Sequence, residues 1–179
     1  MKKILSLTAF VFSMSFYFSQ ELNPPSKEIS IQNKEQVFVN DVPMIKYEVL
    51  EKKIQEKKDV LLVLNFWSTT CAPCVKELPD FMEVNNKYKD NPKFKMLLVS
   101  LDRPKDKERV VQFIKNKKLS AEVILLDDIK RMNTWIPRFE KNWDGNIPVT
   151  IVYKNSEKVH FNDGEMTKTE LENVITKNL

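Results

Sequence analysis

The two cysteines of this chain lie three positions apart, in the segment Cys71-Ala72-Pro73-Cys74. Two thiols at this spacing can form a disulfide with each other and reopen it by thiol-disulfide exchange. A short pair of this kind closes a small loop and stabilises a fold little, and stabilising disulfide frameworks use several bridges. We therefore interpret Cys71 and Cys74 as a redox-active disulfide rather than a structural one.

The pair is expected at the start of a helix that covers residues 72–88. Unpaired backbone N–H groups and the helix dipole favour a thiolate at such a position, so Cys71 is the expected nucleophile. Cys74 lies one turn further along and would resolve a mixed disulfide by attacking the Cys71 sulfur. Pro73 suits the first helical turn, where its missing N–H would have had no partner within the helix.

Strand and helix patterns alternate around this pair. Apolar runs and β-branched residues predict strands at 60–66, 94–101, 123–126, 149–153 and 158–161. Periodic apolar positions predict helices at 44–57, 72–88, 105–117, 129–136 and 167–177. An irregular loop is expected at 137–146, and Pro79 is expected to kink the second helix. The order predicts an α/β fold with a central mixed sheet flanked by helices.

The first 19 residues have the composition of a secretory signal peptide, with Lys2 and Lys3 before an apolar run at 4–18. This run is shorter than the roughly 20 residues that cross a bilayer as a helix. We expect export to the periplasm or cell envelope. An uncleaved membrane tether is the alternative, because the bulky Tyr17 would lie near the cleavage site.

The remaining chain is expected to form a linker at 20–27 and a single domain at 28–179, which opens with a hairpin near 28–39. The formal net charge of the 179 residues is +4. Basic and acidic residues alternate along the predicted helices, which is typical of solvated helix faces. This balance argues against a nucleic-acid partner, and we expect a monomer.

The segment LNFWSTTCAPCVKELP, residues 64–79, resembles the active-site segment of TlpA/ResA-type thioredoxin-like thiol-disulfide oxidoreductases. The likeness extends over about residues 60–179, and GNIPVT at 145–150 is similar to the thioredoxin loop that carries a cis-proline. The resemblance implies a thioredoxin fold with the N-terminal β-hairpin and helix as an extension.

The resemblance also implies roles for single residues. Pro148 would lie beside the cysteines and deter metal capture by the thiols, and the backbone of Ile147 would pair with the substrate peptide. Apart from the resemblance, Trp67, Phe66 and Phe81 have the spacing of core and active-site packing, and Trp67 is the one of the three for which direct substrate contact is the alternative. Thr70 stands where many relatives carry a tryptophan before the first cysteine, which leaves the substrate surface open.

A second difference from thioredoxins, besides Thr70, concerns the residue that accepts a proton. Asn65 stands where they carry a buried aspartate, and an amide cannot accept the proton. By resemblance the task passes to Glu77, the acidic residue one turn after Cys74. The alternative is that Glu77 only complements the dipole near the helix N-terminus.

The function implied is an exported reductase of envelope protein disulfides, with apocytochrome c among the candidate substrates, recharged by a membrane thiol reductant and needing no cofactor or metal. Two other functions stay open. A peroxiredoxin-like peroxidase is suggested by Ser68, although Leu64 stands in place of the proline of that motif and no arginine can be assigned. A copper-delivery module would bind Cu(I) through Cys71 and Cys74.

Overall fold

The computed structural model describes residues 42–179. The predicted signal peptide at 1–19, the linker at 20–27 and the hairpin near 28–39 lie outside the described residues. Within the described part of the chain, no helix has the length and apolar character needed to span a membrane.

A six-stranded sheet with the order β1-β4-β3-β2-β5-β6 forms the centre of the described region. Its strands are β1 (Met44–Ile45), β2 (Leu61–Trp67), β3 (Phe94–Ser100), β4 (Glu122–Leu126), β5 (Val149–Lys154) and β6 (Glu157–Asp163). The pairs β1/β4, β4/β3 and β3/β2 are parallel, whereas β5 runs antiparallel to β2 and β6 antiparallel to β5. The predicted mixed sheet is confirmed.

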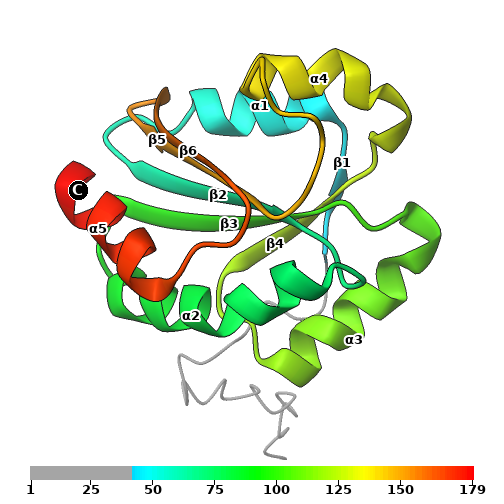
Figure 1. Ribbon diagram of the computed structural model, residues 1–179, viewed down its shortest axis with the longest axis horizontal. Helices are drawn as coiled ribbons and strands as arrows, with labels where there is room; N and C mark the ends of the chain where they lie inside the picture. The colour runs from blue at the N-terminus through cyan, green and yellow to red at the C-terminus, as the bar shows by residue number, and fades with distance from the viewer. Residues whose placement is uncertain (1–41) are drawn as a thin grey trace, which may run out of the picture. The chain divides into compact units, whose positions relative to one another are not determined.

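Helices cover both faces of this sheet (Figure 1). Helices α1 (Tyr47–Gln55) and α4 (Met132–Phe139) lie on one face. Helices α2 (Ala72–Tyr88), α3 (Lys107–Lys117) and α5 (Lys168–Asn178) lie on the other. Short 3₁₀ turns at Pro104–Asp106 and Ile129–Arg131 lead into α3 and α4. Parallel strands need such crossover connections, so the predicted alternation of strands and helices produces a helical layer on each face of the sheet.

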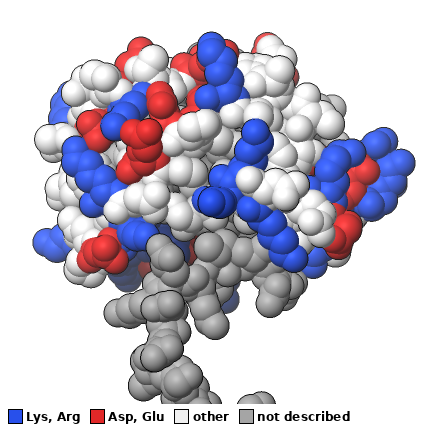
Figure 2. All heavy atoms as spheres, turned by 90° about the horizontal axis from the view of Figure 1, so that it is seen from below, with Lys and Arg blue, Asp and Glu red and all other residues white. Residues whose placement is uncertain are grey.

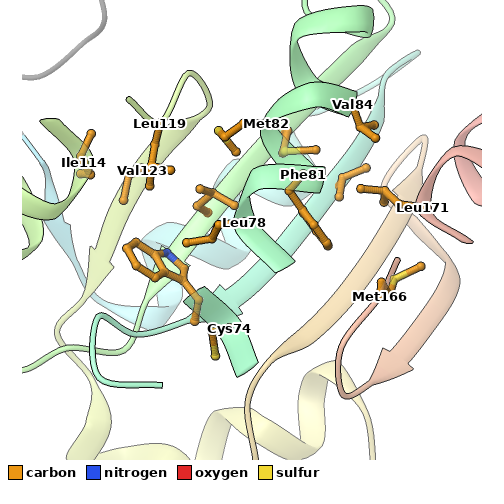
Figure 3. Packing of buried hydrophobic residues seen from close by; sticks show 14 of the residues in the cluster. Cys74, Leu78, Phe81, Met82, Val84, Ile114, Leu119, Val123, Met166 and Leu171 are labelled. Atoms are coloured by element: carbon orange, nitrogen blue, oxygen red, sulfur yellow. The ribbon is translucent and has the colours of Figure 1, made fainter. Parts of the chain in front are cut away.

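Each face of the sheet has its own hydrophobic core. Strand β2 is buried along its whole length, and its side chains alternate between the two cores. Towards α2 the core includes Cys74, Leu78, Phe81 and Met82 (Figure 3). Towards α1 and α4 it is rich in aromatic rings: Tyr47, Phe66, Trp135, Phe139 and Trp143.

The surface carries charges of both signs (Figure 2). Some of them pair between neighbouring helices: Lys87 Nζ lies 3.0 Å from Glu172 Oε1, and Lys168 Nζ lies 2.6 Å from Glu83 Oε2. Both pairs join α2 to α5. Because exposed ion pairs contribute little each, burial of the apolar sides of these helices is the larger stabilising effect.

Two expected boundaries were wrong. The helix expected at 44–57 begins only at Tyr47, because Met44 and Ile45 pair in parallel with the end of β4. The irregular loop expected from 137 also begins later, since α4 continues through Pro137 to Phe139. Phe139 is buried in the aromatic core, and this packing offsets the backbone hydrogen bond that Pro137 cannot donate.

Candidate active site

The cysteines lie where β2 leaves the sheet and α2 begins. Cys71 and Cys74 are joined in a disulfide. Cys71 is the N-cap residue of α2 and is partly exposed, whereas Cys74 is fully buried. A partner disulfide can therefore approach the first sulfur and not the second.

The start of α2 places one backbone donor at the Cys71 sulfur and a second at the Cys71 carbonyl oxygen. The Cys74 N–H points to Cys71 Sγ at an N···S distance of 3.3 Å, and the Val75 N–H donates to the Cys71 carbonyl at 3.0 Å. The amide that now faces a disulfide sulfur would face a thiolate after reduction, and the helix dipole adds to this stabilisation. The location predicted from the sequence is thus the one that the structure gives.

The loop before β5 also reaches the Cys71 sulfur. The Ile147–Pro148 peptide bond is cis, and the Ile147 carbonyl oxygen lies 3.6 Å from Cys71 Sγ. Two hydrogen bonds fix this loop: Gly164 N–H donates to the Pro148 carbonyl at 2.9 Å, and Trp143 Nε1 donates to the Asn146 carbonyl at 2.7 Å. The structure therefore brings Ile147 and Pro148 beside Cys71, as the resemblance implied.

Glu77 lies one turn after Cys74 and is buried, with 4% of its surface exposed. Asn65 Nδ2 donates to its Oε1 at 2.9 Å, and the Met166 N–H donates to its Oε2 at 2.9 Å. Burial raises the pKa of Glu77 to about 7, although the two hydrogen bonds oppose this rise. A carboxyl with this pKa can both accept and return a proton at neutral pH.

Asn65 connects this carboxyl to the sheet. It lies on β2 directly opposite Thr150 of β5, and its Nδ2 donates to Thr150 Oγ1 at 3.1 Å as well as to Glu77. The other amide atom, Asn65 Oδ1, has no hydrogen-bond partner among the described residues. The side chain that replaces the thioredoxin aspartate therefore contacts the group expected to take over its task.

Trp67 is fully buried. Its ring packs against Phe113 of α3, with ring centroids 5.2 Å apart, and belongs to the same core as Cys74. The buried ring is not exposed to a substrate in this structure, so the substrate contact of Trp67 stays a prediction.

Three polar contributors to the site were missed from the sequence: Thr150, the backbone of Met166, and Asp102, which bonds to Thr69 in the loop before Cys71. One feature of the sequence could have identified Asp102, because it lies two residues after the end of the buried strand β3. The carboxyl ends of neighbouring parallel strands lie at one edge of a sheet, and β3 neighbours β2.

Comparisons with known proteins identify the family of this chain. Residues 41–161 match the AhpC/TSA family. The thiol-disulfide oxidoreductase ResA of Bacillus cereus is 31% identical over 132 residues, which cover 72% of this chain and 70% of ResA.

Two solved structures share the fold. StoA from Bacillus subtilis aligns with a TM-score of 0.52 and 24% identity, over 65% of this chain and 82% of StoA. A thioredoxin family thiol:disulfide interchange protein from Chlorobium tepidum TLS aligns with a TM-score of 0.56 and 19% identity, over 68% of this chain and 81% of the other.

The likeness to ResA and the intact cysteine pair favour disulfide exchange over the peroxidase and copper-delivery alternatives. The two solved structures agree with the thioredoxin fold that the resemblance implied. The chain belongs to the AhpC/TSA family, as a thioredoxin-fold thiol-disulfide oxidoreductase of the ResA type.

Proposed function

We propose that this protein reduces disulfides of proteins in the cell envelope, with Cys71 as the nucleophile, Cys74 as the resolving thiol and Glu77 as the proton acceptor. The observation that carries the proposal is the contrast between the two sulfurs. Cys71 is accessible at a helix N-terminus, whereas Cys74 is buried one turn before a carboxyl whose pKa is about 7.

The reaction begins with the reduced pair. The Cys71 thiolate attacks one sulfur of the substrate disulfide, a bond to that sulfur forms, and the other substrate sulfur leaves as a thiolate that takes up a proton. Glu77 then accepts the Cys74 proton, and the Cys74 sulfur attacks the Cys71 sulfur of the mixed disulfide, which breaks the bond between Cys71 and the substrate. The second substrate sulfur leaves as a thiolate and takes up the proton held by Glu77. The substrate has then gained two electrons and two protons, one proton from Cys74 and one from solvent, and the Cys71–Cys74 disulfide has formed.

The loop that carries Ile147 and Pro148 is the surface we assign to the substrate. The Ile147 carbonyl oxygen lies 3.6 Å from Cys71 Sγ. A substrate peptide that is hydrogen-bonded to this backbone would therefore place its own disulfide beside the nucleophile. Apocytochrome c is one candidate among disulfide-bearing envelope proteins, and the protein would act on it as a monomer.

The proposed location of the protein, and with it the proposed direction of electron transfer to the substrate, rest on the N-terminal residues. A signal peptide at 1–19 would deliver the domain, directly or on a membrane tether, to the periplasm or cell envelope, where disulfides are abundant. A reductase in that compartment needs a supply of electrons from a membrane thiol reductant, which would reopen the Cys71–Cys74 disulfide after each turnover.

Trapping of the intermediate tests the assignment of the two thiols. In C74S the resolving step is removed, so a mixed disulfide through Cys71 should accumulate with a disulfide-bearing model protein such as oxidised insulin and be identified by mass spectrometry. C71S should trap no adduct and reduce no substrate. Adducts through Cys74 in C71S, at the rate seen for C74S, would overturn the assignment.

A further inference from the structure

A buried carboxylate outside the reacting groups lies directly under the loop that precedes Cys71. The Asp102 side chain is 1% exposed. Its Oδ2 accepts hydrogen bonds from the Thr69 N–H at 2.9 Å and the Ser100 hydroxyl at 2.8 Å. Its Oδ1 accepts from the Thr69 hydroxyl at 2.6 Å and from Arg109 Nη2 at 3.0 Å. Both oxygens thus hold the same loop residue.

Arg109 closes this network from α3. Its Nε donates to Thr69 Oγ1 at 2.9 Å while its Nη2 pairs with Asp102. Burial by itself would raise the pKa of Asp102, but hydrogen bonds from Thr69, Arg109 and Ser100 outweigh it and lower the pKa. Asp102 is therefore an ionised, fully bonded anchor at neutral pH.

Thr69 connects Asp102 to the nucleophile, because it lies in the loop that leads to Cys71. The loop from Ser68 to Thr70 connects β2 to α2, and the Cys71 N–H donates to the Ser68 carbonyl at 3.2 Å. A cavity of about 230 Å³ is lined by Ser68, Thr70 and Asp102, so part of the loop faces open space there. The bonds of Thr69 to Asp102 and Arg109 tie the loop to its neighbours beside this cavity.

We propose that Asp102, supported by Arg109, is a positioning residue for Cys71: it fixes the Thr69 loop so that the Cys71 sulfur stays at the N-terminus of α2 in both redox states. The inference rests on the proposed role of Cys71 as nucleophile. Released from Asp102, the loop would let the sulfur move away from the Cys74 N–H, and the thiolate would lose stabilisation.

The direction in which the pKa of the Cys71 thiol changes distinguishes a positioning role of Asp102 from an effect of its charge. Loss of the anchor raises the pKa of the Cys71 thiol, because the thiolate loses its donors. Loss of the negative charge of Asp102 acts through space in the opposite direction, because a thiolate near one fewer anion is easier to form. T69V keeps the charge and removes the hydroxyl that bonds to both Asp102 and Arg109, so only positioning predicts a change in this variant.

Asp128 offers a matched control. It is also a buried carboxylate that follows a strand, 5% exposed, and it accepts from the Tyr47 N–H at 3.1 Å and from Arg131 Nε at 2.8 Å. Because it anchors α1 rather than the Cys71 loop, D128A should lower stability without changing the Cys71 thiol.

The experiment is the pH dependence of iodoacetamide alkylation of the reduced full-length protein, with the modified cysteine identified by mass spectrometry. T69V should raise the pKa of Cys71 by about half a unit, which lowers its alkylation rate about threefold at a pH below that pKa. D102A should raise it as well, by an amount reduced by the loss of the negative charge. D128A should leave that rate unchanged. If D102A does not fold, T69V decides.

An unchanged or lowered pKa of Cys71 in folded T69V would overturn the positioning role. The same shift in D128A would overturn it as well, because the effect would then follow from general destabilisation. Failure of the proposed function has a different signature: in the wild-type protein Cys74, not Cys71, would be the faster-alkylated thiol.

Discussion

At the residue scale, the chemistry depends on how Glu77 is held. Its two oxygens accept from Asn65 Nδ2 and the Met166 N–H, yet its burial outweighs these bonds and places its pKa at about 7. Protonated Glu77 could donate to Asn65 Oδ1, which has no partner among residues 42–179, after rotation of the amide. Asn65 is thus suited to bond with either protonation state.

The raised pKa predicts a stability that depends on pH. Folding raises the pKa of Glu77 from 4.5 to about 7, so between these values the folded protein binds more protons than the unfolded chain. The free energy of unfolding should therefore fall as pH rises through this window, by up to about 3 kcal/mol, and stay low above it. In E77Q this contribution is absent.

Urea unfolding of the oxidised wild-type protein and of E77Q at a series of pH values measures the difference. We expect E77Q to gain stability relative to wild type between about pH 5 and about pH 8. E77D, which retains a titrating carboxyl, serves as the control. A constant difference between E77Q and wild type across this range would show that Glu77 does not titrate there.

Spacing alone identified Cys71 and Cys74 at the start of α2, because both lie within one helical turn. Glu77, on the same helix, and the distant Ile147 and Pro148 were identified through the family resemblance. The bonds from Asn65 to Thr150 and from Met166 to Glu77 join residues 85 and 89 positions apart. No periodic pattern encodes such contacts, because they depend on the register of two strands and on the loop before α5.

At the element scale, the start of α5 holds the backbone that serves Glu77. Met166 donates to Glu77 and directly precedes Thr167, the N-cap of α5. Thr167 and Glu170 form a capping box, in which Thr167 Oγ1 accepts from the Glu170 N–H at 3.3 Å and Glu170 Oε2 accepts from the Thr167 N–H at 2.8 Å. The cap fixes where the helix begins and with it the Met166 amide.

Removal of this cap should be measurable. T167A should lower the free energy of unfolding by about 1 kcal/mol, because the N–H of Glu170 loses its acceptor. T167S, which keeps the hydroxyl, should stay within a few tenths of wild type. Denaturant titration of the three proteins checks this, and equal losses in T167A and T167S would argue against the capping role.

Element types were more predictable than element ends. The buried strand β2 was predictable from its apolar run, and helix α2 from its pattern of apolar positions. Together they place the cysteines between the end of β2 and the first turn of α2. The two errors, at Met44–Ile45 and at Pro137, have one cause. Local signals for a helix start and a helix end were overruled by pairing with β4 and by packing in the aromatic core.

At the scale of the whole molecule, two cores on a mixed sheet hold the site at one edge. Phe81 is fully buried in the core between α2 and the sheet (Figure 3). F81A should lower the free energy of unfolding by about 3–5 kcal/mol through lost burial and the cavity that remains. V159A, at a position 42% exposed on β6, should change it by less than about 0.5 kcal/mol.

Thermal or urea unfolding of F81A and V159A compares the two sites under one condition. Similar losses in both variants would contradict the assignment of the core. The class of fold was predictable because alternating buried strands and amphipathic helices leave few architectures. The order of strands in the sheet was not predictable from periodicity, since it depends on which strands pair.

The central claim is that the Cys71–Cys74 pair gives electrons to substrates, and its equilibrium reduction potential tests this most directly. The fraction reduced in dithiothreitol or glutathione buffers can be followed by tryptophan fluorescence, because Trp67 shares a core with Cys74. We predict a potential close to that of thioredoxin, about −270 mV. A potential close to that of a strong oxidant, about −120 mV, would contradict the account and make the protein a donor of disulfides.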